Sequence, residues 1–161
     1  MNVPSLIITA APHFKDDDST PRIMWTVVAS LVPVIAGSAF FFGVSALLVI
    51  FAATLGALLT ERFLGRPRSL RDGSAMITGL LLGLCLPPGI PLWMAFLGSV
   101  FGIGFGKVIW GGLGQNVFNP ALIGRAFLQT AFPVAITTWP KPGGDFFALK
   151  GDLFAFPFMH P

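Results

Sequence analysis

The chain has 161 residues, of which 54% are hydrophobic and 11% are charged. Soluble domains carry about 25% charged residues, so this composition argues against a soluble domain and indicates a membrane protein of one domain or part of one. The net charge of +3 includes no dense basic run, and lysines and arginines beside membrane spans explain it better than nucleic-acid binding does.

Residues 1–22 are predicted to form a cytoplasmic N-terminal arm. They carry an acidic patch at residues 16–18 and both basic and acidic side chains, which a secretory signal peptide lacks. The apolar region that follows is also too long for the core of a signal peptide. We expect a membrane domain over residues 23–139 after this arm.

A helical hairpin is expected to open the membrane domain. No charged residue occurs between Ile23 and Thr60, and a spanning helix needs about 20 apolar residues. The run is therefore long enough for two spans, which we place at residues 23–42 and 45–62. The turn between them is expected near Phe42–Ser45.

The segment "ERFLGRPRSLRDG" follows this hairpin and carries four arginines. Such a basic loop marks the cytoplasmic side, and the N-terminus, two spans earlier, must then lie on that side too. Asp72, Gly73 and Ser74 end the loop. Either Asp72 or Ser74 is a good cap for the next helix, or the free amides of that helix face an anionic or polar ligand. The residues alone favour the cap.

Two short apolar segments come next, which we place at residues 74–88 and 91–107. They are separated by "PPGIP", and both are short for a complete span. They are either halves of a discontinuous helix that lines a site or two short tilted helices. Gly98 and Gly102 form a GxxxG pair, which favours close helix packing over any dinucleotide-binding role.

The stretch "GGLGQNVFNPALIGRAF" holds the polar residues most suited to a ligand. Asn116 and Asn119 offer amide groups at the membrane surface, where the polar edge of an isoalloxazine or quinone ring could bond them. Asn119 is also a good cap for a fifth helix over residues 120–139, because proline suits the first helical position. Arg125, inside that helix, is expected to snorkel to the surface or to pair with Asp72 or a ligand anion. The alternative is turn chemistry with an arginine that only sets topology.

Residues 140–161 are expected on the extracytoplasmic side of the membrane. They contain only Lys141 and Lys150 as basic residues, and the last apolar run breaks off as if cut short before a second repeat. The basic residues on the cytoplasmic side, joined by Arg125 if it snorkels, are Lys15, Arg22, Arg62, Arg66, Arg68, Arg71 and Lys107.

Neither a metal site nor a hydrolytic site is visible in the sequence. His13 and His160 stand alone, and the single Cys85 cannot hold a zinc ion or an iron–sulfur cluster, which need about four ligands. We predict no catalytic residue and no metal ligand in this chain.

Four motifs in order give the chain a family resemblance. "APHFKDDDSTPRIMW", "RDGSAMITGLLLGLCLPPGIPLWM", "GKVIWGGLGQN" and "FNPALIGRAFLQTAFP" resemble the RnfD/NqrB family, whose members are membrane subunits of the Rnf and sodium-pumping NADH:quinone oxidoreductase complexes. The short arm and the "RIM" at the first helix are more similar to RnfD than to NqrB. The resemblance covers roughly residues 11–133.

The resemblance implies an all-α membrane protein built as an inverted-repeat bundle, of which this chain supplies the first repeat. It further implies an electron-carrying subunit in a bacterial inner membrane, with other membrane subunits and flavin and iron–sulfur subunits as partners. In the family, FMN is bound through its phosphate to a threonine of a Ser/Thr-x-Ala-Thr motif in the second half. That motif is absent here, and Thr78 in the partial echo "DGSAMIT" does not match the acceptor position.

A non-covalent riboflavin, bound in the sodium-pumping branch, is the other cofactor that the resemblance implies. Asn116 and Asn119 match its expected neighbourhood. The further candidates for a flavin or quinone neighbourhood are Arg125, Asp72, Gly73 and Ser74.

Three functions remain open on the sequence. The first is electron transport through flavin coupled to Na⁺ or H⁺ movement, in an Rnf-type or an NqrB-type subunit. The second is a non-redox transporter or channel domain, since inverted repeats with broken helices are also a transporter design. The third is a scaffolding subunit whose partners carry out the chemistry.

Overall fold

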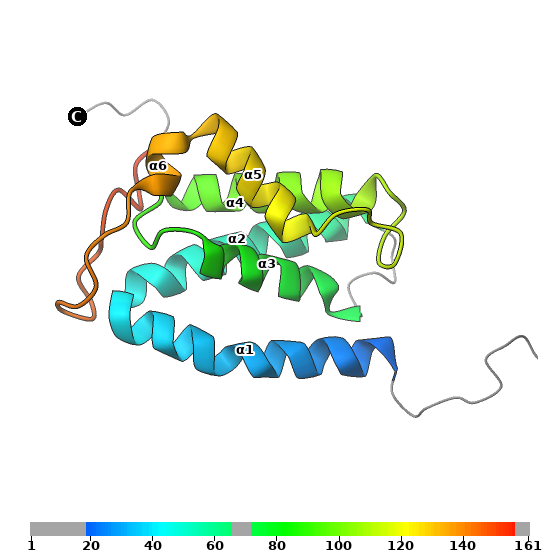
Figure 1. The fold of residues 1–161 in the computed structure, drawn as a ribbon, viewed down its shortest axis with the longest axis horizontal. Helices are drawn as coiled ribbons and strands as arrows, with labels where there is room; N and C mark the ends of the chain where they lie inside the picture. The colour runs from blue at the N-terminus through cyan, green and yellow to red at the C-terminus, as the bar shows by residue number, and fades with distance from the viewer. Residues whose placement is uncertain (1–18, 66–71, 157–161) are drawn as a thin grey trace, which may run out of the picture.

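The computed structural model describes residues 19–65 and 72–156 of the chain (Figure 1). The described residues form helices and loops and contain no strand, which confirms the all-α class. Within these residues there are five longer helices, as expected, together with a π-helical turn and one short helix. The elements are α1 (Thr20–Phe42), α2 (Val44–Leu64), α3 (Ser74–Cys85), α4 (Leu92–Ile103), η2 (Gly104–Val108), α5 (Pro120–Ala131) and α6 (Pro133–Thr137).

The helical hairpin of α1 and α2 forms where the uncharged run predicts it. Both helices are long and apolar enough to cross a membrane. Gly43 joins them with φ of 70°, and an added Cβ there would lie 2.4 Å from the backbone oxygen of Phe146. Only glycine fits both the left-handed backbone and this close approach. The turn predicted near Phe42–Ser45 is therefore confirmed at Gly43.

Helix α2 is the centre of the bundle and packs against both α3 and α4. Small residues allow these helices to approach closely. An added Cβ at Gly79 of α3 would lie 2.4 Å from the Cα of Thr54, and one at Gly56 of α2 would lie 2.7 Å from the backbone oxygen of Phe96. Membrane helices gain stability from such close contact, since lipid removes most of the hydrophobic drive between them.

The short segments expected at residues 74–88 and 91–107 are α3 and α4 with η2. A helix of 12 residues such as α3 rises only about 18 Å, against about 30 Å for the hydrocarbon core. The loop at residues 86–91 that continues α3 is largely buried, with Pro87, Pro88 and Pro91 inside the protein. Irregular backbone at membrane depth is tolerated where protein covers it, as happens here.

One expected element is wrong in extent. We predicted a single fifth helix over residues 120–139, but α5 ends at Ala131 and α6 covers only Pro133–Thr137. The break falls at Phe132, whose φ of −136° and ψ of 60° are not helical. Pro133 lacks an amide hydrogen and disfavours helical backbone in the residue before it, so the helix stops there.

The pair Gly98 and Gly102 packs against α5, as the GxxxG spacing predicts. An added Cβ at Gly102 would lie 2.5 Å from the backbone oxygen of Pro120, and one at Gly124 would lie 2.5 Å from that of Gly98. Helices α4 and α5 therefore touch through backbone along this seam.

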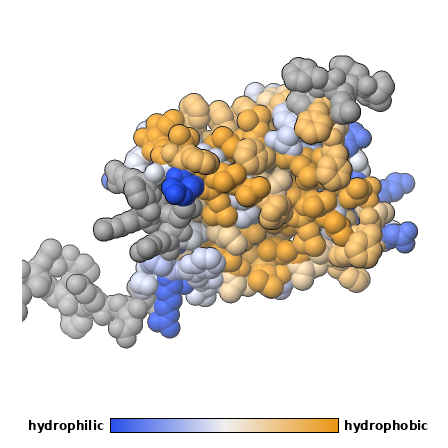
Figure 2. Space-filling model, turned by 180° about the vertical axis from the view of Figure 1, so that it is seen from behind, coloured by the Kyte–Doolittle hydropathy of each residue, from blue (hydrophilic) through white to orange (hydrophobic). Residues whose placement is uncertain are grey.

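The outer surface is apolar over its middle. Figure 2 shows hydrophobic residues across the centre of one face and hydrophilic groups gathered toward its two ends. Exposed apolar side chains in the middle of the two long helices include Val32 and Val34 of α1 and Phe51 and Leu55 of α2. Together with the two long apolar helices, this surface fits an all-α membrane protein.

The two ends of the bundle differ. The glycine-loop end contains the glycine loop, residues 109–119, and comprises residues 61–65, 72–74 and 104–119. The proline-loop end contains the proline-rich loop at residues 86–91 and comprises residues 43, 86–91 and 132–156. The chain after α6 packs on the proline-loop end, where the amide of Leu92 donates to the oxygen of Leu153 at 2.9 Å.

Candidate functional site

Two oppositely charged side chains are buried together at the glycine-loop end. Lys107 of η2 is 3% exposed and Glu61 of α2 is 1% exposed, and the Lys107 ammonium donates to Glu61 Oε1. Lys107 also donates to the hydroxyl of Ser74, the first residue of α3. The ammonium thus joins three elements at one point inside a protein whose helices are otherwise almost uncharged.

Asp72 connects this buried pair to the surface. Its Oδ1 accepts from the backbone amide of Ser74 at 2.9 Å and from the Ser74 hydroxyl. Asp72 is half-buried, whereas Ser74 is buried. A chain of hydrogen bonds therefore runs from Asp72 through Ser74 and Lys107 to Glu61.

The start of α3 differs from the predicted cap by Asp72 or Ser74. Its N-cap is Gly73, which has no side-chain cap. Gly73 has φ of 75°, a left-handed conformation in which glycine has no Cβ strain. The Asp72 carboxylate, one residue before the N-cap, still accepts from the amide of Ser74 and so satisfies one free amide of the first turn.

Lys107 lies in a turn of π-helix, which is rare and is often found at functional sites. The amide of Ile109 donates to the oxygen of Gly104, five residues earlier, at 3.1 Å. Gly106 within this turn packs against Pro120, and an added Cβ would lie 2.8 Å from the Cα of Pro120. The wide turn and the missing side chain bring the start of α5 next to Lys107.

The loop after η2 is built on three left-handed glycines. Gly111, Gly112 and Gly114 have φ of 105°, 107° and 88°. The amide of Gly112 donates to the backbone oxygen of Lys107 at 3.0 Å, so the loop is fixed to the residue that carries the buried ammonium.

The two asparagines at the end of this loop have different local roles. Asn119 caps α5, since its Oδ1 accepts from the amide of Ala121 at 2.9 Å. The Asn116 amide donates to the backbone oxygen of Phe118 at 3.2 Å. The cap predicted for Asn119 is confirmed, and the Nδ2 of Asn119 and the Oδ1 of Asn116 remain for a ligand.

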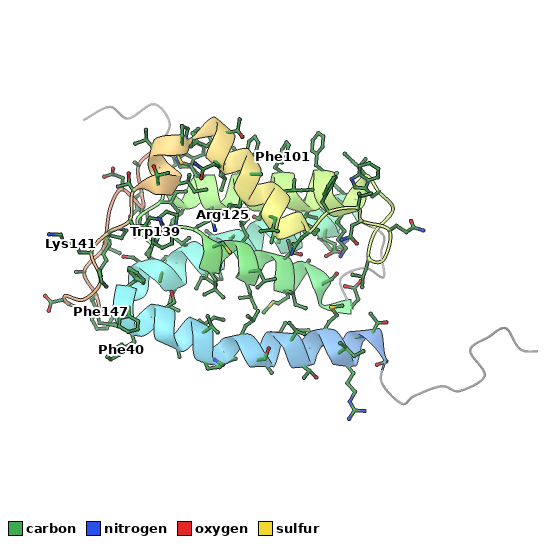
Figure 3. The ribbon with its side chains drawn as sticks, viewed as in Figure 1. Phe40, Phe101, Arg125, Trp139, Lys141 and Phe147 are labelled. Carbon is green, nitrogen blue, oxygen red and sulfur yellow. The ribbon has the colours of Figure 1, made fainter. Side chains whose placement is uncertain are left out.

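Arg125 does not join the other candidate residues. Its side chain is exposed on α5, and within the described residues it forms no ion pair with Asp72. Figure 3 places Arg125 part-way along the bundle, away from the end at which α3 begins. The buried residues of α5, namely Pro120, Ala121, Gly124 and Leu128, lie on the other side of the helix.

Glu61 and Lys107 are the site residues that the sequence did not reveal. Both come at the end of an apolar run, where Lys107 was interpreted as a marker of membrane topology and Glu61 was assigned no role. They are 46 positions apart, so only the packing of α2 against η2 brings them together. The sequence did contain one signal for Lys107. It is the single charged residue between Asp72 and Arg125, in a long and mostly apolar stretch.

Comparison with known proteins identifies the family. The model of the NQR2, RnfD, RnfE family matches residues 7–156. The chain belongs to the NQR2, RnfD, RnfE family. The resemblance expected from the four motifs is thereby confirmed.

Two curated relatives carry similar names. The chain is 47% identical over 138 residues to the D subunit of the proton-translocating ferredoxin:NAD(+) oxidoreductase complex of Clostridium ljungdahlii, covering 83% of this chain and 42% of that protein. It is 43% identical over 141 residues to the D subunit of the ion-translocating oxidoreductase complex of Escherichia coli, covering 84% of this chain and 40% of that protein. The chain thus spans less than half the length of these relatives.

Proposed function

We propose that this chain is the first part of a membrane subunit of an Rnf-type ion-translocating electron-transport complex. The observation that carries the proposal is the match of residues 7–156 to the family. Relatives named as the D subunits of such complexes support it. The complete subunit carries electrons through flavin, coupled to movement of Na⁺ or H⁺. It belongs to the bacterial inner membrane, works with other membrane, flavin and iron–sulfur subunits, and is not active alone.

The glycine loop has the chemistry to hold a flavin ring. Asn116 and Asn119 each have a free amide donor or acceptor, and the apolar side chains of Trp110, Val117 and Phe118 are exposed around them. Polar groups against an apolar wall are what an amphipathic ring requires. A bound riboflavin would supply one-electron transfer at this place, while the chain itself binds and orients the ring.

The covalent FMN of the family is assigned to the part of the subunit that follows this chain. Among the described residues, Thr78 is the threonine nearest to the partial motif, and its hydroxyl is already bonded to the oxygen of Ser74 at 3.0 Å in the buried part of α3. Because this hydroxyl is already hydrogen-bonded, we propose no phosphate ester at Thr78.

The absorbance spectrum of the purified full-length subunit tests the proposal. We expect a flavin spectrum, part of which is lost on denaturation as free riboflavin and part of which stays with the polypeptide. After cleavage on the C-terminal side of residue 161, the in-gel flavin fluorescence should be found in the C-terminal fragment. A subunit without flavin that takes up ions alone in liposomes would instead favour the transporter function.

A further inference from the structure

We propose that the hydrogen-bonded chain Asp72–Ser74–Lys107–Glu61 is a proton uptake path of this subunit. The inference rests on the proposed function, because it assigns the ion-handling part of that function to named residues. It is carried by geometry. Four side chains from three elements form one unbroken series of hydrogen bonds, from a half-buried carboxylate to a fully buried one.

Stability alone is a poor reason for such a pair. Buried ion pairs often contribute no more stability than apolar side chains of similar volume, because both charges lose their hydration. Ionisable groups within membrane segments are rare and mark ion pathways and proton relays. Glu61 and Lys107 are buried charged residues at the ends of long apolar segments, whereas Arg62 beside Glu61 is exposed.

The proton transfer along the path balances without any change in oxidation state. Asp72, which accepts from the Ser74 hydroxyl as a carboxylate, first takes a proton from water and becomes a carboxylic acid. Lys107 passes one N–H proton to Glu61, which also becomes a carboxylic acid. The Ser74 hydroxyl turns and gives its proton to the neutral amine, and the Ser74 oxygen takes the proton of Asp72. One proton has then moved from water through Asp72 to Glu61, and Asp72 is a carboxylate again.

The groups along the path suit this transfer. Ser74 both donates to Asp72 and accepts from Lys107, so it can pass a proton in either direction. The ammonium has three protons, of which one faces Glu61 and one faces Ser74. The transfer requires the Ser74 hydroxyl to turn from Asp72 to Lys107.

The path adjoins the candidate flavin site. The backbone oxygen of Lys107 holds the glycine loop through Gly112, and Asn116 lies four residues further along. The candidate flavin site and the path therefore lie at the same end of the bundle, the glycine-loop end.

Two arginines lie on neighbouring elements at this end of the bundle. Arg62 is exposed at the next position of α2, and Arg22 is exposed near the start of α1, which meets α3 at Gly73 through Trp25. Apart from Lys107, helix α4 and η2 contain no charged residue. Within the path, Asp72 is the half-buried carboxylate and Glu61 is the buried one.

The test measures electron transfer and proton movement in the same membrane vesicles, with the full-length subunit in its assembled complex. The variants are Asp72→Asn, Ser74→Ala and Glu61→Gln. Asparagine keeps an acceptor for the Ser74 amide but cannot carry a proton, and the control Asp145→Asn changes an exposed acid at the proline-loop end. We expect at least a tenfold fall in protons moved per electron in all three variants, with electron transfer within threefold of the wild type, rescue by Ser74→Thr, and no change in the control.

Several outcomes would overturn the proposal. Equal falls in electron transfer and proton movement would make the four residues structural, and a normal proton-to-electron ratio in Asp72→Asn and Ser74→Ala would remove the path. A wild-type complex that moves Na⁺ but no protons would also contradict it. If deleting the subunit leaves electron transfer unchanged, the proposed function itself fails, which is a different result.

Discussion

Asn119 has a structural task that Asn116 does not share, and this difference decides how each is to be tested. The side chain of Asn119 caps α5, so replacing it with an apolar residue removes a helix cap worth about 0.5–2 kcal/mol as well as any ligand contact. Asn116 bonds only the oxygen of Phe118 in the loop. A loss of function in Asn116 variants is therefore the clearer sign of a ligand.

We expect Asn116→Leu in the full-length subunit to slow electron transfer by the complex roughly tenfold to hundredfold. The reason is that an unpaired polar edge of a bound ring loses about 1–3 kcal/mol. Asn119→Ser should keep the cap and still lower turnover, because serine lacks the amide donor group. The measurement is turnover with flavin occupancy determined on the same sample.

The matched control for this pair is Gln115→Leu, an exposed amide in the same loop. It should leave turnover unchanged. Normal turnover and occupancy in Asn116→Leu and Asn119→Ser, with a defect only in Asn119→Leu, would contradict a ligand site. Residues 115–119 would then be only a loop and a helix cap.

At the scale of residues, local features of the site were predictable and distant ones were not. The Asp72 bond to the first turn of α3, the left-handed Gly73 and the Asn119 cap all follow from neighbours within three positions, which the sequence displays directly. The pairing of Glu61 with Lys107 depends on how α2 packs against η2, and no local sequence pattern predicts this tertiary contact.

At the scale of elements, the seam between α4 and α5 is held by glycine. Gly102→Ala should lower the stability of the complex by about 1–3 kcal/mol, because the new methyl group would lie 2.5 Å from the backbone oxygen of Pro120. The nearby Gly104→Ala should cause no loss, since a Cβ there has nothing within 4 Å. Thermal unfolding of the two complexes in detergent makes the comparison, and equal melting temperatures would contradict the seam.

Helix boundaries were predictable where proline, glycine or charge marks them. Gly43 ends α1, "PPGIP" separates α3 from α4, and Pro120 begins α5, all as expected. The expected helix over residues 120–139 ran through Pro133 because its apolar residues continued on both sides. Pro133 was a stronger signal than this apolar pattern, because proline interrupts the helix before it, and α6 begins there as a separate helix.

At the scale of the whole molecule, the outer face of α5 is unusual for a bundle in lipid. Arg125, Gln129 and Thr130 are exposed on it, although the face shown in Figure 2 is largely apolar over its middle. Charged side chains in membrane segments face protein or water, since lipid penalises them by about 2.5–3.5 kcal/mol. The curated relatives are more than twice as long as the matched region, so in those proteins further chain exists beside this region.

We therefore expect Arg125→Leu to destabilise the complex that contains the full-length subunit. Removal of a charge from a lipid-facing position would stabilise it, so the direction of the change decides between the two environments. Melting temperature in detergent is the measurement, and Lys141→Leu, in the exposed segment after α6, is the control that should do nothing. An increase in melting temperature for Arg125→Leu would place this face against lipid.

The orientation of the bundle is the last prediction. The structure puts the start of α1, the end of α2, the start of α3 and the glycine loop at one end, so a single measurement orients them all (Figure 1). Arg22 and Arg62 lie at that end, and in sequence Arg66, Arg68 and Arg71 fall between α2 and α3, outside the described residues. At the opposite end, Lys150 has its ammonium bonded to the backbone oxygen of Gly143 at 2.7 Å, which reduces its availability to lipid headgroups.

Basic residues collect on the cytoplasmic side of membrane proteins, so the glycine-loop end should be cytoplasmic and residues 140–156 should be outside. Single cysteines at Leu113 and Asp145, both exposed, test this in a Cys85→Ala background. In intact cells a membrane-impermeant maleimide should label position 145 and leave position 113 unmodified until the membrane is opened. The reverse pattern would show that the bundle has the opposite orientation. Asp72, where the proton path begins, would then lie on the extracytoplasmic side of the membrane.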